Sequence, residues 1–408
     1  MWPIGMVSMP VYPAPGVYLE LFLEVPDLLD TPPPPDRGDP PLPGRSRWHA
    51  ERGTAAFLGA TPLGDSPDVV TLTDADEVAS AFGQAPDARS PLAAAIRGYF
   101  ANGGSSCYVV SVGRPGEPLD PAAVAGHGGR HRTGLAALER FDDIAMVCLP
   151  ELMRLGAPDG NDLDAVVAAQ HAAIAHCEEA GNRVALLDAP PEAGPGDALD
   201  HRRRLPDSAS AALYHPWLRP AAGGPAVPPC GHLAGAFASA DRTYGPHRGP
   251  VGIPLRDVAE PISTLANHEQ ALLVPAAVNA IVATRGIVTA QSARALSTEQ
   301  RWRNLPTRRT MNFLYRNLHA GTNWAIQHRP GERGLWARLA RDVEQLLHLA
   351  WRGGSLLGTT AGEAYAVRCD AATNPPEIAA GGLTRLVGVA SIDGPRSTPF
   401  ALVWCSAF

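Results

Sequence analysis

The residues that could do chemistry are scattered, and their spacing fits no catalytic or metal-binding pattern. Residues 159–163 read Asp-Gly-Asn-Asp-Leu, like the start of a calcium-binding loop, but Leu163 stands where an oxygen ligand is needed. His171, His176 and Cys177 fall on one predicted helix, and His171 lies five and six residues from the other two, whereas two metal ligands on one helix face are four apart. We expect a helix cap in the first case and ordinary core or surface side chains in the second.

The composition excludes several catalytic classes. All 34 Lys-plus-Arg positions are arginine, so the chain has no P-loop of the GxxxxGK[ST] type, no Schiff-base lysine and no SxxK nucleophile. Residues 103–107 read Gly-Gly-Ser-Ser-Cys and lack the second glycine of a nucleophile elbow. We therefore predict no catalytic, cofactor-binding or metal-binding residue. An α/β enzyme of unknown reaction using residues 54–290 stays open as the alternative, because triads assemble from distant residues.

Length and composition indicate a globular chain with more than one domain. The 408 residues are 45% hydrophobic and 18% charged, which is typical of packed cores and not of disorder. The six cysteines are far apart and form no CxxC pair, so we expect free thiols in a reducing compartment. No apolar run reaches the roughly 18 residues of a membrane helix, and the start shows no signal-peptide pattern.

Charge is unevenly distributed along the chain. Residues 294–352 contain eleven Arg against four acidic residues, whereas the whole chain has a formal net charge of −7. Such asymmetry suggests two different surroundings. The basic segment is either a solvated helix face or a surface turned toward an acidic partner.

The elements that would position this basic segment are predicted by periodicity. Leu335–Arg352 has apolar residues at i, i+3 and i+4 spacing, from Trp336 to Trp351, and is predicted to be a helix with one buried face. Its other face carries Arg338 and Arg341. Three β-rich runs follow, and the C-terminal third is therefore expected to lay helices on a small sheet. These runs are residues 364–369, 384–392 and 400–405.

Near the N-terminus lies a strand without a hairpin partner. Val17–Glu24 alternates with a period of two and is flanked by prolines that cannot continue a sheet. A lone strand is not stable in water, so this one pairs with a distant strand, either in its own chain or in another. Residues 31–50 are rich in proline and are predicted to be a linker.

Between residues 54 and 290 the pattern is α/β. Ser90-Pro91 is typical of a helix start, and Leu163–Ala180 is predicted to be a helix that begins at Asp162 or Asp164. Strands are expected on both sides of this second helix. That spacing favours parallel strands joined by a crossover. The predicted strands include residues 55–59, 107–112, 144–149 and 184–187.

Several motifs occur in a fixed order along the chain. The first part has Pro15–Glu20 (PGVYLE), Gly53–Gly59 (GTAAFLG) and Ile96–Gly104 (IRGYFANGG). The last part has Trp302-Arg303, Gly321–Ala325 (GTNWA), Leu335–Arg338 (LWAR) and Cys369–Glu377 (CDAATNPPE). Together they resemble the contractile tail sheath proteins of phage tails, R-type pyocins and extracellular contractile injection systems, over nearly the whole chain.

The resemblance implies a mixed α+β and α/β fold in which the two chain ends belong to one domain. It implies an N-terminal arm and strand (1–30), a proline-rich linker (31–50), an outer α/β domain (51–290) and an inner α+β domain with a C-terminal arm (291–408). In such proteins the terminal strands reach into the sheets of neighbouring subunits and join them in a helical mesh. The residues expected to link subunits here are Val17, Tyr18, Leu19, Leu21, Leu23, Phe400, Leu402, Val403 and Trp404, with residues 394–399 as a tether before the last strand.

The resemblance also implies partners. A sheath of many copies, in stacked rings, surrounds an inner tube and ends at a baseplate and a cap, without nucleic acid, cofactor or membrane insertion. Assembly would take place in a bacterial cytoplasm as part of a phage tail or tail-like particle, with release to the outside as a further step. Whether the particle is a phage tail, a bacteriocin or an injection system, and whether a paralogue shares the lattice, stays open. The residues expected to face the tube are Arg301, Arg303, Arg308, Arg309, Arg338 and Arg341.

Overall fold

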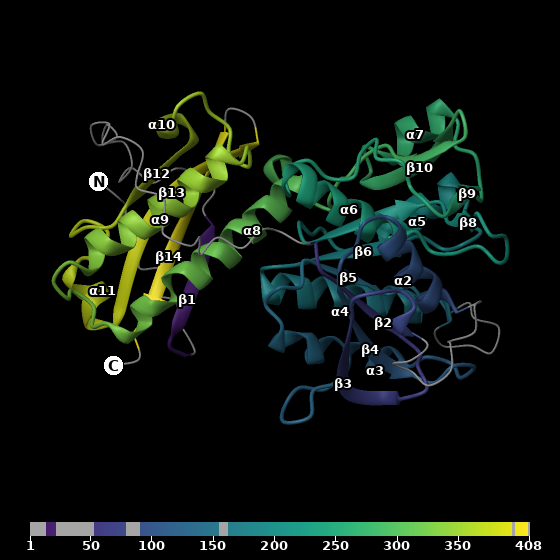
Figure 1. Cartoon of the computed structure of the whole chain (residues 1–408), viewed down its shortest axis with the longest axis horizontal. Helices are drawn as coiled ribbons and strands as arrows, with labels where there is room; N and C mark the ends of the chain where they lie inside the picture. The colour runs from purple at the N-terminus through teal and green to yellow at the C-terminus, as the bar shows by residue number, and fades with distance from the viewer. Residues whose placement is uncertain (1–13, 22–52, 79–89, 155–161, 394–395, 407–408) are drawn as a thin grey trace. The chain divides into compact units, whose positions relative to one another are not determined.

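The computed structural model describes residues 14–21, 53–78, 90–154, 162–393 and 396–406, and divides the chain into two compact units. We call residues 50–313 the central unit, and residues 1–49 together with 314–408 the terminal unit (Figure 1). The division falls inside helix α8 (Leu305–Thr322), later in the chain than residue 291. Residues 291–313 belong to the central unit because Leu305 lies in its core and Arg309 pairs with Asp241 there.

The central unit is built on an eight-stranded sheet with the order β11-β10-β7-β6-β5-β2-β4-β3. The six strands from β10 to β4 run parallel, as the α/β pattern predicts, and β11 and β3 pair antiparallel at the two edges. The strands are β2 (Ala55–Gly59), β3 (Gly64–Leu72), β4 (Cys107–Gly113), β5 (Met146–Cys148), β6 (Val184–Asp188), β7 (Ala211–His215), β10 (Val278–Thr284) and β11 (Ile287–Ala290).

Helices cover both faces of this sheet, so alternate residues of each strand enter different cores. Phe57 of β2 packs with α2 (Pro91–Ala101) and α6 (Cys230–Tyr244). Its neighbour Leu58 packs with α4 (Leu163–Ala180) on the opposite face. Both faces are apolar because parallel sheets are buried on both sides. Shorter elements complete the unit: α3 (Pro121–Ala125), α5 (Pro195–Arg203), α7 (Asn267–Leu273), and the pair β8 (Leu218–Pro220) and β9 (Val258–Pro261).

Local signals explain where the helices begin and how closely they pack. The Ser90 hydroxyl accepts the Ala93 N–H at the start of α2, and the Asp162 carboxylate accepts the N–H groups of Asp164 and Ala165 at the start of α4. Helices α2 and α6 approach so closely that a Cβ on Gly231 would lie 2.2 Å from the Ala95 carbonyl oxygen. Only glycine fits there.

The terminal unit is an antiparallel four-stranded sheet with the order β1-β14-β13-β12. The strands are β1 (Gly16–Leu21), β12 (Tyr365–Arg368), β13 (Leu383–Asp393) and β14 (Arg396–Cys405). The first and last described strands of the chain therefore lie side by side, with Val17 opposite Trp404 (Figure 1). The helical elements of this unit are the second half of α8, η5 (Asn323–Gln327), α9 (Leu335–Arg352), α10 (Ala361–Ala364) and α11 (Pro376–Ala380).

Helix α9 has the bounds that the periodicity predicts. Leu339 and Val343 on its apolar face are fully buried, whereas Trp336 and Trp351 are half-buried. The three strands predicted in the C-terminal third are also confirmed as β12, β13 and β14.

One expectation about the chain ends is wrong, and two others concern residues that the structure does not describe. Arg396–Pro399 are not a tether, because they continue β14 and pair with Val389–Asp393 of β13. Leu23 and the proline-rich linker 31–50 lie outside the described residues.

All six cysteines are free thiols, and Cys107, Cys148, Cys177 and Cys230 are buried. Within the described ranges, no helix combines the length and apolar character needed to cross a bilayer.

Candidate functional site

The strongest candidate site is the set of contacts that hold β1 and β14 in the terminal sheet. Strand β14 is a central strand with β1 on one side and β13 on the other, and its residues 398–404 are buried. Its main-chain groups therefore pair on both sides. Of the expected linking residues, Phe400, Leu402, Val403 and Trp404 are at most 2% exposed.

Trp404 is the anchor of β14. Its ring is 1% exposed, and its indole Nε1 donates a hydrogen bond of 3.2 Å to the Thr322 hydroxyl at the end of α8. The Thr322 hydroxyl in turn donates to the Leu318 carbonyl at 2.6 Å. The polar atom of the largest buried side chain in this sheet thus has a fixed partner, as a buried indole requires.

Phe400 fixes the register at the other end of the strand. It lies directly opposite Gly388 of β13, and a Cβ on that glycine would be 2.6 Å from the Phe400 ring. The ring therefore occupies the space that any other residue at position 388 would need. A shift of β14 by one residue would lose this fit and turn every side chain to the other face.

Strand β1 lies at the edge of the described sheet and pairs with β14 on one side. Val17 is 3% exposed, and its carbonyl accepts a 3.3 Å hydrogen bond from the Tyr315 hydroxyl. Tyr18 and Leu19 are half-buried, and Leu21 lies opposite Phe400. The structure thus brings together eight of the nine expected linking residues, all in one chain.

The second candidate surface is the polar face of α9. Arg338 and Arg341 are exposed, and no carboxylate among the described residues pairs with either of them. The Arg338 guanidinium lies 3.7 Å from the centre of the Trp324 ring, and the Trp324 indole donates to Asp342 at 3.1 Å. Arg338 is therefore held in place and still faces solvent.

The basic character extends to the segment before α9. Arg329 and Arg333 are exposed, and α9 has no acidic residue in its first turn and no side-chain cap at Gly334. Positive charge near a helix N-terminus opposes the helix dipole, and the exposed Glu332 between these two arginines offsets part of that effect.

The other four expected tube-facing arginines lie in the central unit and differ in exposure. Arg303 is exposed, and Arg301 is half-buried and pairs with Glu299 at 2.8 Å. Arg308 is half-buried, with its guanidinium 5.7 Å from the centre of the Trp302 ring.

The expectation for Arg309 is wrong. Its side chain is 2% exposed and makes two hydrogen bonds, of 2.8 and 2.5 Å, to the carboxylate of Asp241, which is fully buried. The guanidinium also lies 4.6 Å from the centre of the Phe237 ring. A buried, bidentate pair of this kind ties the first half of α8 to α6 and leaves no charge for a partner.

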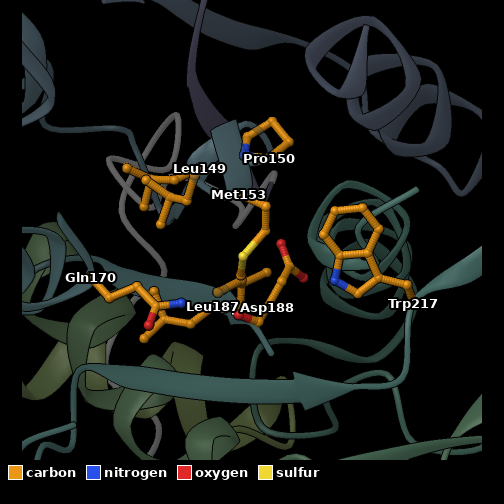
Figure 2. A pocket seen from close by; sticks show the side chains of 9 residues that line it. Leu149, Pro150, Met153, Gln170, Leu187, Asp188 and Trp217 are labelled. Carbon is orange, nitrogen blue, oxygen red and sulfur yellow. Dashed lines mark hydrogen bonds between the residues drawn. The ribbon is translucent and has the colours of Figure 1, made fainter. Parts of the chain in front are cut away.

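A hollow of the central unit lies near the carboxyl ends of β5 and β6, where an α/β enzyme would bind a ligand. Leu149, Met153, Gln170 and Trp217 line it together with Asp188 (Figure 2). It is too narrow to admit a water molecule. Among the described residues that line it, only Asp188 has a titratable side chain.

Asp188 has a structural role instead. Its carboxylate accepts the N–H of Cys230, the first residue of α6, at 3.0 Å, and so caps that helix from a distant strand. Burial raises the pKa of Asp188 to about 7, and the Cys230 hydrogen bond opposes part of that rise.

The described histidines and cysteines that are candidate metal ligands in the sequence lie in other contacts. Within the described ranges, no group of three or more His, Cys, Asp or Glu side chains is placed to hold a metal ion. His171 bonds the Arg204 carbonyl at 2.8 Å, and His176 contacts the Arg183 guanidinium at 3.3 Å. Residues 159–161 of the calcium-like segment lie outside the described residues, and Asp162 is the cap of α4.

Comparison with known proteins gives matches at the level of structure. No protein-family model matches the sequence, and no curated protein matches it. The PVC sheath complex of an extracellular contractile injection system, in its contracted state, matches with a TM-score of 0.67 and 20% identity, over 85% of this chain and 90% of that chain. The baseplate structure of the anti-feeding prophage matches with a TM-score of 0.66 and 21% identity, over 85% and 91%. The sheath tail protein Lin1278 from Listeria innocua matches with a TM-score of 0.59 and 9% identity, over 86% and 95%.

Proposed function

We propose that this chain, which has the fold of contractile sheath proteins, is a structural subunit of a contractile sheath. Many copies would polymerise as a helical sheath around an inner tube and contract to drive the tube through a target envelope. The observation that carries the proposal is the match to a contracted sheath over 85% of this chain and 90% of the other.

The terminal sheet supplies the means of linking subunits. A strand contributes mainly main-chain hydrogen bonds, so β1 of a second copy can occupy the same register beside β14. Residues 22–49 separate β1 from the central unit and can span at most about 100 Å when extended. A sheet closed within one chain and a sheet shared between copies make the same contacts, which is the relation known as domain swapping. Exchange of β14 would in addition open the connection between Asp393 and Arg396.

Links of this kind suit a contracting lattice. Strand pairing persists while the rest of each subunit rotates, and a head-to-tail interface that does not close gives a helical filament. Larger subunit contacts in the contracted state would supply the free energy. No nucleotide is required, which agrees with a chain that has no lysine for a P-loop.

Negative-stain microscopy of the purified protein, alone and with its tube partner, tests the proposal. The sheath account predicts tubes of uniform diameter. Compact, monodisperse particles under all assembly conditions would instead favour the α/β enzyme.

The basic face of α9 is our proposed contact with the tube, and its partner would be acidic. Arg338 and Arg341 are exposed there, with Arg329 and Arg333 nearby in the chain. A single exposed ion pair contributes only about 0.2–1 kcal/mol, but a helical lattice repeats each pair in every subunit. Baseplate and cap proteins, and a sheath paralogue, are further partners that we propose from the likeness to sheaths. Assembly in a bacterial cytoplasm is part of the same proposal.

Charge reversal at Arg338 and Arg341 is expected to prevent loading of the sheath on the tube. The double variant R338E/R341E loses the contact of Arg338 with the Trp324 ring, but both side chains are exposed, so its melting temperature should stay within a few degrees of the wild type. Co-sedimentation with tubes at low and high salt measures the loss, which should be largest at low salt, where charges are least screened.

The control is R130E/R256E, which makes the same change in charge at exposed positions of the central unit. This variant should load as the wild type does. If R338E/R341E also loaded normally at low salt, α9 would not be the tube-facing surface.

A further inference from the structure

The terminal sheet has a bare stretch on one side. Strand β13 has eleven residues, whereas β12 beside it has only four and pairs with Val387–Ala390. Among the described residues, no strand lies beside Leu383–Leu386 on the β12 side. Unpaired main-chain groups at a sheet edge are a template for a strand of another chain.

The side chain of Asn374 occupies this place. Its Oδ1 accepts the Arg385 N–H at 2.6 Å, and its Nδ2 donates to the Arg385 carbonyl at 2.8 Å. A carboxamide presents one acceptor and one donor side by side, as a peptide group does. Asn374 thus pairs with β13 in the way that one residue of a neighbouring strand would.

The turn before Asn374 holds the carboxamide rigidly. The Asp370 carboxylate accepts the N–H groups of Ala372 and Thr373 at 2.9 and 3.2 Å, and Asn374 Nδ2 also donates to the Asp370 carbonyl at 3.0 Å. Asn374 is 5% exposed, and Pro375 follows it. The residue before a proline is restricted to extended backbone, so this turn has little freedom to move the amide away.

The opposite edge carries a similar contact. The Tyr315 hydroxyl donates to the Val17 carbonyl of the edge strand β1. Main-chain groups at both sides of the sheet are thus bonded by side chains that come from neighbouring elements.

We propose that Asn374 is an edge cap, which prevents an edge strand of a second copy from pairing with Leu383–Leu386. The CDAATNPPE segment would then stop the sheet from adding a fifth strand at this edge. Copies of the chain would join by exchange of β1 or β14 instead. The inference goes beyond sheath assembly, because it concerns unwanted pairing between isolated subunits.

The test compares isolated N374A subunits with the wild type before any assembly. We expect N374A to form thioflavin-positive lateral aggregates about tenfold faster, with a rate that rises steeply with concentration, because the carboxamide no longer occupies the place of a neighbouring strand. The control is V387A, which shortens a buried side chain of the same strand and leaves Asn374 in place. The solution conditions are chosen so that N374A and V387A have the same melting temperature, which excludes a difference in stability as the cause of a difference in aggregation rate.

A second variant shows whether the aggregation starts at this edge. In N374A/R385P the proline removes the N–H that Asn374 bonds, which lies on the side away from β14, and aggregation should return to the wild-type rate. Equal rates for N374A and V387A at equal melting temperature would overturn the proposal. Fast aggregation of N374A that R385P did not slow would overturn it as well.

Discussion

Substitution of Trp404 by alanine is expected to prevent sheath formation and to destabilise the terminal unit by about 3–5 kcal/mol, as for other buried tryptophans. The ring is 1% exposed in the central strand β14, and its indole nitrogen has a fixed partner in Thr322. The truncation leaves a cavity and removes the N–H that the Thr322 oxygen accepts, while the Thr322 hydroxyl keeps its own bond to the Leu318 carbonyl. Urea unfolding followed by circular dichroism measures the loss, and negative-stain microscopy measures assembly.

The conservative variant W404F separates packing from hydrogen bonding. Phenylalanine keeps most of the apolar contact and loses only the bond to Thr322, so we expect a cost of about 1 kcal/mol and normal assembly. A W404A protein that melts and assembles like the wild type would show that β14 does not hold the terminal sheet together.

Acid is expected to unfold the central unit between about pH 6.5 and pH 4. Four of its histidines are buried, and burial lowers the pKa of each to about 4. Nearby arginines lower it further for three of them, whereas Asp197 and Glu269 oppose the shift at His215. The four residues are His176, His201, His215 and His232.

The number of protons that each state binds decides whether acid raises or lowers the stability. In the unfolded chain these histidines bind protons below a pKa of about 6.5, whereas in the folded chain they stay neutral to about pH 4. The unfolded state therefore binds more protons, and stability falls as the pH falls through this window. A full shift contributes roughly 3 kcal/mol per histidine, so four together match the whole stability of a typical domain.

Asp188 acts in the opposite direction. Its pKa of about 7 in the folded state means that the folded chain binds this proton first, so its contribution to stability rises as the pH falls from about 7 toward 4. The stability that the Asp188 carboxyl gains in acid offsets about the stability that one of the histidines loses. D188N, which keeps an oxygen for the Cys230 N–H, should make the loss of stability with acid steeper.

Urea unfolding at pH values from 7.5 to 4.5 measures this dependence. H232L should flatten part of the curve, because neither ring nitrogen of His232 has a hydrogen-bond partner within the described residues and leucine suits the same apolar site. A free energy of unfolding that stayed constant down to pH 4.5 would contradict the assignment of these buried, neutral histidines.

The sequence predicted those elements whose signals are local. Helices α4 and α9 have the predicted bounds, because an apolar period and a cap at Asp162 or a run starting at Leu335 define them without tertiary information. The parallel pairing of β5 and β6 on either side of α4 was also predictable from spacing. Edge strand β3 and the hairpin of β10 and β11 were not predicted, since their burial depends on neighbours far away in the chain.

The residues of the candidate sites could likewise be predicted only where their signals are local. A periodic pattern could place Arg338 and Arg341 on the polar face of α9, and the structure confirms that they are exposed there. It could not reveal that Arg309 is buried, because its partner Asp241 lies 68 residues away on another helix. Asn374 was part of a recognised motif, but its pairing with Arg385 depends on the sheet and has no local signal.

The central claim is that the end strands join different copies of this chain, and a disulfide between β1 and β14 tests it most directly. Gly16 lies opposite Cys405 in the register, and neighbouring Cα atoms of antiparallel strands are about 4.5–5.5 Å apart, within the range of a disulfide. The atoms nearest to the Cβ of a G16C variant belong to the Tyr18 side chain, at 3.4 and 3.5 Å, which is ordinary van der Waals contact. Half-buried Cys369 is replaced by serine in this protein, and the control G16C/C369S/C405S lacks the acceptor thiol.

The measurement is a denaturing, non-reducing gel of G16C/C369S after assembly and mild oxidation. Strands shared between copies predict a ladder of covalent multimers that the control lacks and that reductant removes. Assembled particles that gave only monomers with an internal 16–405 disulfide would show that each chain keeps its own ends, and would contradict the account.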